Sequence, residues 1–292
     1  MCAGKHENAL PWIVTLGAET LLIILGNIVT VIVFWKNRNQ LKQTCILLIN
    51  LTVADLLVGI GNIESVVVEI HKNFMTSSSS QTTWGDFVVS EELFGCASIG
   101  FLALVSLERL YAVVWPLRIR TTSTRKYFFS VGVVWLLSST IAVAQLLGTA
   151  ATLITEDIFI WFVTMYLFAC LIIISCAYSA VWFFSRKEDP RLPPNRYNRS
   201  KELAKTLFIV TLLSLITWLP FTVVHNLRFT LKGNIAFGSV FDDVAQVLYL
   251  ANSFINPVVY CFKMPLFSRT LRKVLLRKNT ALQHVRERQT WP

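Results

Sequence analysis

The chain has 292 residues, of which 54% are hydrophobic and only 15% are charged, and its mean hydropathy is +0.57. A soluble domain needs more charged residues to cover its surface, so a wholly soluble protein is excluded. The net charge of +10 is a second bias, and its meaning depends on where the basic residues lie.

Seven apolar runs predict seven membrane-spanning helices, because each run is about as long as a bilayer core is thick. They lie at residues 10–36, 43–70, 85–116, 126–148, 158–184, 203–231 and 238–262. We therefore expect an all-α membrane protein, with a seven-transmembrane helix bundle over residues 1–262.

The positions of Lys and Arg predict how the bundle is oriented. The connections after the first, third and fifth runs, together with the C-terminal tail, hold all 27 basic residues except Lys5, Lys72, Arg109, Arg228 and Lys232. The basic side of a membrane protein is cytosolic, so we expect an extracellular N-terminus and a multi-pass protein of the plasma membrane. The positive charge then reflects topology and attraction to anionic lipid of the bilayer, and binding of nucleic acid is not expected.

The second run contains two acids, Asp55 and Glu64. An acid at the bilayer centre costs about 2.5–3.5 kcal/mol on insertion scales, so Asp55 indicates function, with a neutral, hydrogen-bonded Asp as the alternative. In an ideal helix Glu64 falls on the face opposite Asp55, toward lipid. We hypothesise that a bulge or kink at Gly59 and Gly61 turns Glu64 inward.

The third run carries polar residues along one face. Glu91 and Arg109 are about five helical turns apart, and Ser98 lies about 20° from the line that joins them. This line is roughly 27 Å long, close to the thickness of the hydrocarbon core. Such a face must point into the bundle, so the third helix is predicted to be its axis.

Prolines interrupt the last two runs, Pro220 in the sixth and Pro257 in the seventh. A proline inside a membrane helix removes one backbone hydrogen bond and kinks the helix. Residues 263–278 place Phe267 and Leu271 on one side and basic residues on the others, which predicts a short eighth helix in the inner membrane interface. Residues 279–292 are expected to form a disordered cytosolic tail.

Six short motifs, in order along the chain, resemble those of the rhodopsin-like (class A) G-protein-coupled receptors. They are Gly26-Asn27, residues 51–56 with Asp55, Glu108-Arg109-Leu110, Trp135, Trp218-Leu219-Pro220, and NPVVY at residues 256–260. The resemblance implies a receptor rather than an enzyme. Such a receptor converts binding of an extracellular ligand into nucleotide exchange on a heterotrimeric G protein.

The resemblance also implies an activation switch. Arg109, beside Glu108, would hold the resting state and then meet the G protein when the sixth helix swings outward. Trp218 would be the pivot beneath the ligand. The remaining residues implied in the switch are Tyr178, Pro220, Pro257 and Tyr260.

An internal sodium ion is implied at four residues, Asp55, Ser98, Asn252 and Asn256. An oxygen-rich pocket in hydrocarbon, anchored by one carboxylate, suits a hard monovalent cation. A water-filled hydrogen-bond network is the alternative for the same four residues.

The chain departs from the family pattern at positions that affect the resting state and the outer surface. Trp84 stands where the family usually has a cysteine at the outer end of the third helix, and no partner cysteine follows the fourth. The acid often found at the inner end of the sixth helix is absent, and Ser200 is at about that place. Without this ionic partner for Arg109 the resting state is weaker, so we predict ligand-independent activity.

The outer half of the bundle is predicted to be acidic, and a cationic ligand, an amine or a basic peptide, would be drawn to it. Glu91 is the main candidate counter-ion, with Glu64, Trp218 and Gln246 as further candidates for ligand binding. Glu91 could instead be protonated, or paired with His225 or Arg228. The acids assigned to the outer half are Glu7, Glu19, Glu64, Glu69, Asp86, Glu91, Glu92, Glu156, Asp157, Asp242 and Asp243.

Other ligands and another class of protein stay open. The absent disulfide and the proline-free fifth helix resemble the melanocortin and lipid-receptor branches, which would bind a lipid or a calcium-assisted peptide. Residues 240–262 contain no lysine that could hold retinal as a Schiff base. A secondary transporter is the alternative of another class, although such folds show internal repeats that are not visible here.

Overall fold

The computed structural model describes residues 3–41, 43–74, 85–151, 156–185, 239–274 and 276, together with residues 205, 208–209, 212–214, 216–224 and 227. Some side chains at helix ends, including those of Glu91, Glu92, Asp242 and Asp243, lie outside the description. Within the described residues, all regular secondary structure is helical.

Six of the described helices are long and apolar enough to cross a membrane. The first, second, third, fourth, fifth and seventh predicted spans are thereby confirmed, with ends that agree within a few residues. The described part of the sixth includes an apolar helix at Leu212–Val224. The six helices are α1 (Ala3–Lys36), α3 (Gln43–Phe74), α4 (Gly85–Val114), α6 (Thr124–Ala151), α7 (Glu156–Ser185) and α9 (Ser239–Lys263), and two short helices, α2 (Arg38–Leu41) and α5 (Arg118–Thr121), lie between them.

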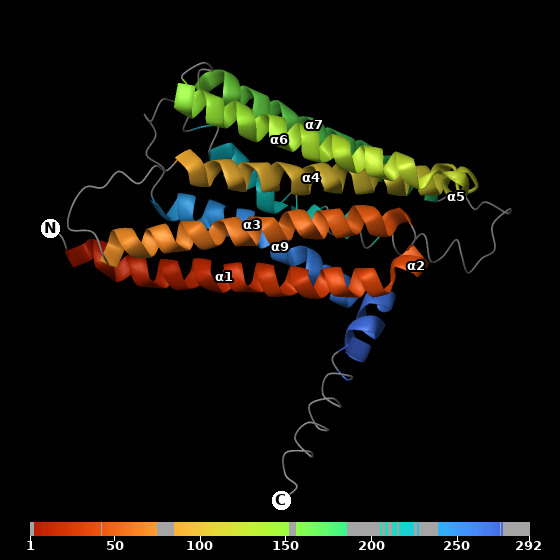
Figure 1. The fold of residues 1–292 in the computed structure, drawn as a ribbon, viewed down its shortest axis with the longest axis horizontal. Helices are drawn as coiled ribbons and strands as arrows, with labels where there is room; N and C mark the ends of the chain where they lie inside the picture. Colours follow the sequence, from red (N-terminus) through yellow and green to blue (C-terminus); the bar gives the residue numbers. More distant parts are fainter. Residues whose placement is uncertain are drawn as a thin grey trace, which may run out of the picture.

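Helix α4 is the axis of the bundle, as predicted. It packs against α3, α6 and α7, whereas α1 packs against α3 and α9 (Figure 1). Ser98 is fully buried and Arg109 is 5% exposed, so the polar face of α4 points inward over the part whose side chains are described.

Glu64 does not point into the bundle. Helix α3 is one continuous α-helix across Gly59 and Gly61, and the Glu64 side chain is exposed. The hypothesis of a bulge that turns Glu64 inward is therefore wrong. Gly59 instead allows α1 to come close, because a Cβ atom at this position would lie only 2.7 Å from Cγ2 of Ile23.

Gly59→Ala is expected to lower the thermal midpoint of the purified protein by several degrees. Overpacking a tight helix contact costs about 1–3 kcal/mol, and each kcal/mol shifts the midpoint by roughly 2–4 °C in a chain of this size. Gly17→Ala is the matched control, because nothing lies within 4 Å of a Cβ atom there. Equal midpoints for the two variants, measured at one heating rate, would contradict the packing role of Gly59.

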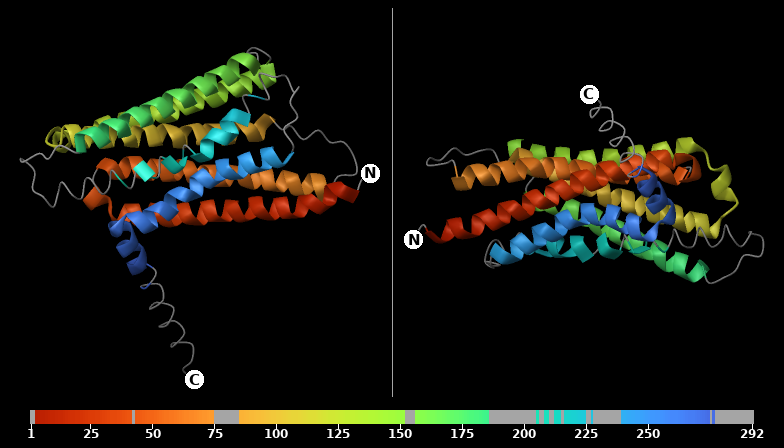
Figure 2. Two further views of the ribbon diagram at one scale, coloured as in Figure 1. Left: turned by 180° about the vertical axis from the view of Figure 1, so that it is seen from behind. Right: turned by 90° about the horizontal axis from the view of Figure 1, so that it is seen from below.

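The inner end of α9 is held by a cluster of three aromatic rings. The ring of Phe34 lies 5.2 Å from that of Tyr260 and 5.5 Å from that of Phe267, and the rings of Tyr260 and Phe267 are 6.0 Å apart. Phe267 belongs to residues 265–274, which form a helix that turns away from the bundle after α9 (Figures 1 and 2).

This last helix has the amphipathic pattern predicted for residues 263–278. Phe267 is buried, and Leu271 packs against the core. The basic side chains of Arg269, Arg272 and Lys273 are exposed. The predicted tail at residues 279–292 lies outside the described residues and stays a prediction.

Candidate functional site

Asp55, fully buried in the middle of α3, is the centre of the first polar site. The Ser98 hydroxyl of α4 donates a hydrogen bond to its Oδ1 at 2.6 Å, and Nδ2 of Asn256 in α9 donates to its Oδ2 at 2.7 Å. One carboxylate therefore joins three helices that are far apart in sequence. The structure brings together Asp55, Ser98 and Asn256 as the sequence indicated.

The same site contains two amide oxygens that accept no hydrogen bond from the described residues. They are Oδ1 of Asn252, whose side chain is 1% exposed, and Oδ1 of Asn256. A buried acceptor without a donor costs about 1–3 kcal/mol, so such atoms call for a water molecule or a cation. A carboxylate surrounded by neutral oxygens has the chemistry that a hard monovalent cation requires.

Two further motif residues hold helices together. Nδ2 of Asn27 donates to the backbone oxygens of Ile23 at 2.9 Å and Ser253 at 3.0 Å, which ties α1 to α9. Nε1 of Trp135 donates to Oδ1 of Asn50 at 3.2 Å, which ties α6 to α3. These contacts fix the helices around Asp55.

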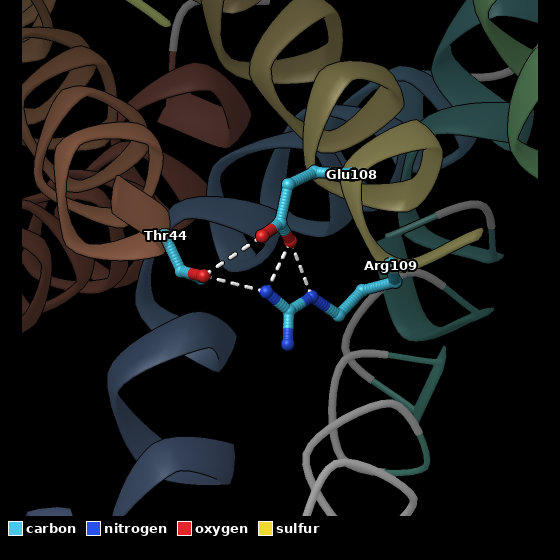
Figure 3. A network of polar contacts seen from close by, with 3 residues as sticks. All are labelled: Thr44, Glu108 and Arg109. Carbon is cyan, nitrogen blue, oxygen red and sulfur yellow. Dashed lines mark hydrogen bonds and ion pairs between the residues drawn. The ribbon is translucent and has the colours of Figure 1, made fainter. Parts of the chain in front are cut away.

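A second polar site lies at the inner end of α4 and consists of Thr44, Glu108 and Arg109 (Figure 3). The Thr44 hydroxyl donates to Oε1 of Glu108 at 2.9 Å and accepts a hydrogen bond from Nη2 of Arg109 at 2.6 Å. The Arg109 guanidinium also forms an ion pair with Oε2 of Glu108, and both side chains are 6% exposed. Arg109 is thus held by its own helix and by the start of α3.

The other residues implied in the switch lie on α7, the sixth helix and α9. Tyr178 of α7 is buried, with its ring 5.3 Å from that of Phe208. The hydroxyl of Tyr260 is fully buried and has no hydrogen-bond partner among the described residues. Pro220 is half-buried in the helical residues 216–224, and Pro257 lies inside α9.

Trp218 belongs to an aromatic cluster in the outer half of the bundle. Its ring lies 4.9 Å from the ring of Tyr249, edge to face, and Tyr249 stacks on Phe221 at 4.8 Å. A Cβ atom at Gly95 of α4 would lie 2.6 Å from the Tyr249 hydroxyl, so these rings pack directly on the α4 backbone.

The structure does not gather all the predicted ligand-binding residues in one place. Trp218 is buried in the aromatic cluster, and Gln246 is half-buried on α9. Glu64 is exposed, and the Glu91 side chain lies outside the described residues. A counter-ion role for Glu91 therefore stays a prediction.

Sequence reasoning missed four polar residues that the structure buries. Thr44 gave no signal, because a single Thr near the start of an apolar run is common. Glu19 was grouped with the outer acids, although its place in an apolar run could have marked it as an intramembrane acid. The other two are Thr20 and Asn62, which are hydrogen-bonded to each other.

Comparison with known proteins gives a consistent picture. Residues 26–260 match the family model for the 7 transmembrane receptor (rhodopsin family). The chain is similar to "Rhodopsin, GQ-coupled" of Mizuhopecten yessoensis, with 25% identity over 86% of this chain and 56% of that protein. It is also similar to Opsin-3 of Mus musculus (26% identity, 89% of this chain, 69% of that protein) and to Adenosine receptor A3 of Ovis aries (24% identity, 87% of this chain, 86% of that protein). The chain thus spans little more than half the length of the first of these relatives and most of the length of the third.

Proposed function

Because the chain belongs to the rhodopsin family of seven-transmembrane receptors, we propose that it converts binding of an extracellular cationic ligand into nucleotide exchange on a heterotrimeric G protein. As a member of this family it is a multi-pass protein of the plasma membrane and a receptor, not an enzyme. This assignment replaces the alternative of a secondary transporter.

The observation that carries the proposal is the buried arrangement around Arg109. A guanidinium is always charged and binds oxygen acceptors through its planar set of N–H donors. Here these donors bind Glu108 and Thr44 inside the bundle. An outward movement of the sixth helix would open the cytosolic side of the bundle, so that a partner could compete for the guanidinium. Among the described residues, the acceptors for Arg109 come only from α3 and α4. In the sequence, Ser200 is at about the place where the family often carries an acid at the inner end of the sixth helix, which favours activity without ligand.

The experiment that tests this function is nucleotide exchange without agonist. Purified protein in lipid nanodiscs is mixed with heterotrimeric G proteins of each class, and GTP-analogue uptake is compared with that of the G protein alone. Faster uptake with at least one class is expected. Uptake equal to that of the G proteins alone, for every class, would contradict the proposed ligand-independent exchange.

Thr44→Val is expected to raise agonist-free exchange by at least about tenfold. The valine keeps the size of the side chain but loses the hydroxyl that bonds both Glu108 and Arg109. A hydrogen bond to a charged group contributes about 1.5–3 kcal/mol, and its loss destabilises only the arrangement that contains it. Thr52→Val is the matched control, because the Thr52 hydroxyl bonds only the backbone oxygen of Leu48. The same exchange rate for both variants would show that the Thr44 contacts do not hold the resting state.

The Asp55 site is proposed to bind a sodium ion in the resting state. Two observations support the proposal: the carboxylate is fully buried, and the amide oxygens of Asn252 and Asn256 lack donors within the described residues. Asp55, Ser98, Asn252 and Asn256 would hold the ion. Bound there, sodium would stabilise the arrangement in which α3, α4 and α9 meet.

The ligand is proposed to carry a positive charge that Glu91 binds. Glu91→Gln is then expected to lower the potency of an active amine or basic peptide at least tenfold, since a hydrogen bond to a charged group is worth about 1.5–3 kcal/mol. Potency is measured as agonist-stimulated exchange, with Glu91→Asp, which keeps the charge, as the control. Equal potency on the wild type and Glu91→Gln would eliminate this counter-ion. If instead only a peptide acts and a calcium chelator abolishes its effect, the calcium-assisted alternative is supported.

A further inference from the structure

A third group of buried polar residues lies in the outer half of the bundle, apart from both sites described above. We call Glu19, Thr20 and Asn62 the outer polar cluster. Glu19 is 8% exposed and Asn62 is fully buried. Nδ2 of Asn62 donates to the Thr20 hydroxyl at 2.7 Å, and that hydroxyl donates to the backbone oxygen of Leu16 at 2.7 Å.

The outer polar cluster contains two acceptors that the described residues leave unsatisfied. They are Oε2 of Glu19 and Oδ1 of Asn62. Thr20 cannot serve either of them, because its single hydroxyl proton is already donated to Leu16. A carboxylate oxygen and an amide oxygen, both buried in a membrane span, therefore require a donor from elsewhere.

Helix periodicity fixes the depth of the cluster. Asn62 comes two turns after Asp55 on the same face of α3, and Thr20 comes two turns before Asn27 on α1. The cluster therefore lies roughly 10 Å nearer the extracellular side than the Asp55 site. It is too far from Asp55 to share an ion with it.

Periodicity also shows which helix the Glu19 side chain faces. Gly26 packs on α9, since a Cβ atom there would lie 3.4 Å from Pro257. Glu19 lies about 20° from the direction of Gly26 on α1, and Gln246 lies about 20° from the direction of Pro257 on α9. Glu19 thus points toward α9, and Gln246, a residue already predicted to bind ligand, points toward α1 roughly 6 Å nearer the extracellular side.

The described side chains supply no positive charge to this acid. Along the outer halves of α1, α3 and α9, the only described basic side chain is that of His71, which is exposed at the outer end of the second span. This end is roughly 13 Å along α3 from Asn62. An acid in hydrocarbon without a basic partner marks a functional site by default.

We propose that Glu19 and Asn62 bind the ammonium group of an organic ligand between α1, α3 and α9. The inference rests on the proposed receptor function and gives the ligand an anchor that is separate from Glu91. An ammonium group has three donors and no acceptor, so it can satisfy a carboxylate and an amide oxygen together. Tyr249, two turns before Asn256 on α9, lies at the depth of Asn62 in the buried aromatic cluster, toward which the apolar part of the ligand would extend. The class of ligand is therefore a primary arylalkylamine.

The test is binding of phenethylammonium chloride to the purified full chain in nanodiscs, measured as a dose-dependent rise of the thermal midpoint. The neutral probe is 2-phenylethanol, and KCl keeps the ionic strength constant. A rise with the cation that exceeds the rise with the alcohol is expected. In Glu19→Gln and in Asn62→Leu, the apparent affinity for the cation should fall at least tenfold.

Two controls separate binding from stability. Thr15→Val removes an exposed hydroxyl of α1 that bonds the backbone oxygen of Pro11 and should bind the cation like the wild type. Glu19→Asp keeps the charge and should retain more affinity than Glu19→Gln. A purely structural role of Glu19 would change the midpoint without the probe but leave the dose dependence unaltered. That result, or equal rises with cation and alcohol in the wild type, would overturn the proposal. Agonist-free exchange by the wild type tests the receptor function separately.

Discussion

Arg109→Ala is expected to reduce nucleotide exchange to that of the G protein alone, a loss of well over tenfold. Removing one partner of a buried, hydrogen-bonded charge pair costs about 2–5 kcal/mol, and each 1.4 kcal/mol is a factor of ten. The contact that is lost is the one proposed for the active state, between the Arg109 guanidinium and the G protein. The measurement is GTP-analogue uptake at equal receptor density.

Because Arg109 also has contacts in the resting state, the Arg109→Ala experiment needs control variants. Arg109→Ala also leaves Glu108 without its ion pair, so a fall in exchange could reflect lost folding. Thr44→Val removes contacts of the same resting site, and exchange is expected to rise. Opposite effects of the two variants would separate the switch from general damage. Arg38→Ala, which removes an exposed basic side chain at the same end of the bundle, should behave like the wild type. Normal exchange in Arg109→Ala would end the proposed role of this residue.

Asp55→Asn is expected to abolish the stabilisation of the protein by sodium. If the ion binds at about one tenth of the salt concentration used, it adds roughly 1.4 kcal/mol to the stability of the wild type. This corresponds to a midpoint about 3–5 °C higher in NaCl than in KCl. The asparagine keeps the shape of the side chain but removes the single charge among the four side chains of the site.

Two further variants make the sodium result specific. Ser98→Ala removes a neutral donor to Oδ1 and should weaken the sodium effect without erasing it. Glu64→Gln removes a carboxylate from the same helix, where it is exposed, and should leave the effect intact. Equal midpoints of the wild type in NaCl and KCl would favour the alternative, a water-filled hydrogen-bond network.

The spans and the polar face of α4 could be predicted from the sequence, because both follow from periodicity along one helix. The contacts of Asp55 were implied by the resemblance to a family, and the geometry places Ser98 and Asn256 on its two oxygens. In contrast, the partner of Arg109 across helices could not be predicted. Thr44 lies 65 residues before it, and only the packing of α3 on α4 brings them together.

The prediction for Glu64 was wrong because a glycine in a membrane helix can indicate either a bulge or a close contact between helices. In an ideal helix Glu64 points toward lipid, and a bulge at the nearby Gly59 and Gly61 would have turned it inward. The structure shows that Gly59 serves the approach of Ile23, a contact between helices that no pattern within one helix reveals. The Asn62–Thr20 hydrogen bond escaped notice for the same reason, since each residue has its partner on another helix.

The three rings at the inner end of α9 connect the basic helix at residues 265–274 with Tyr260, a residue implied in the switch. Phe267 sits in the basic helix that follows α9, and its ring touches both Phe34 and Tyr260. Anionic headgroups that pull on Arg269, Arg272 and Lys273 would tilt this helix and displace Phe267. Tyr260 would then lose one of the two ring contacts described for it, so the surrounding lipid would act on the proposed switch from the face of the membrane opposite the ligand.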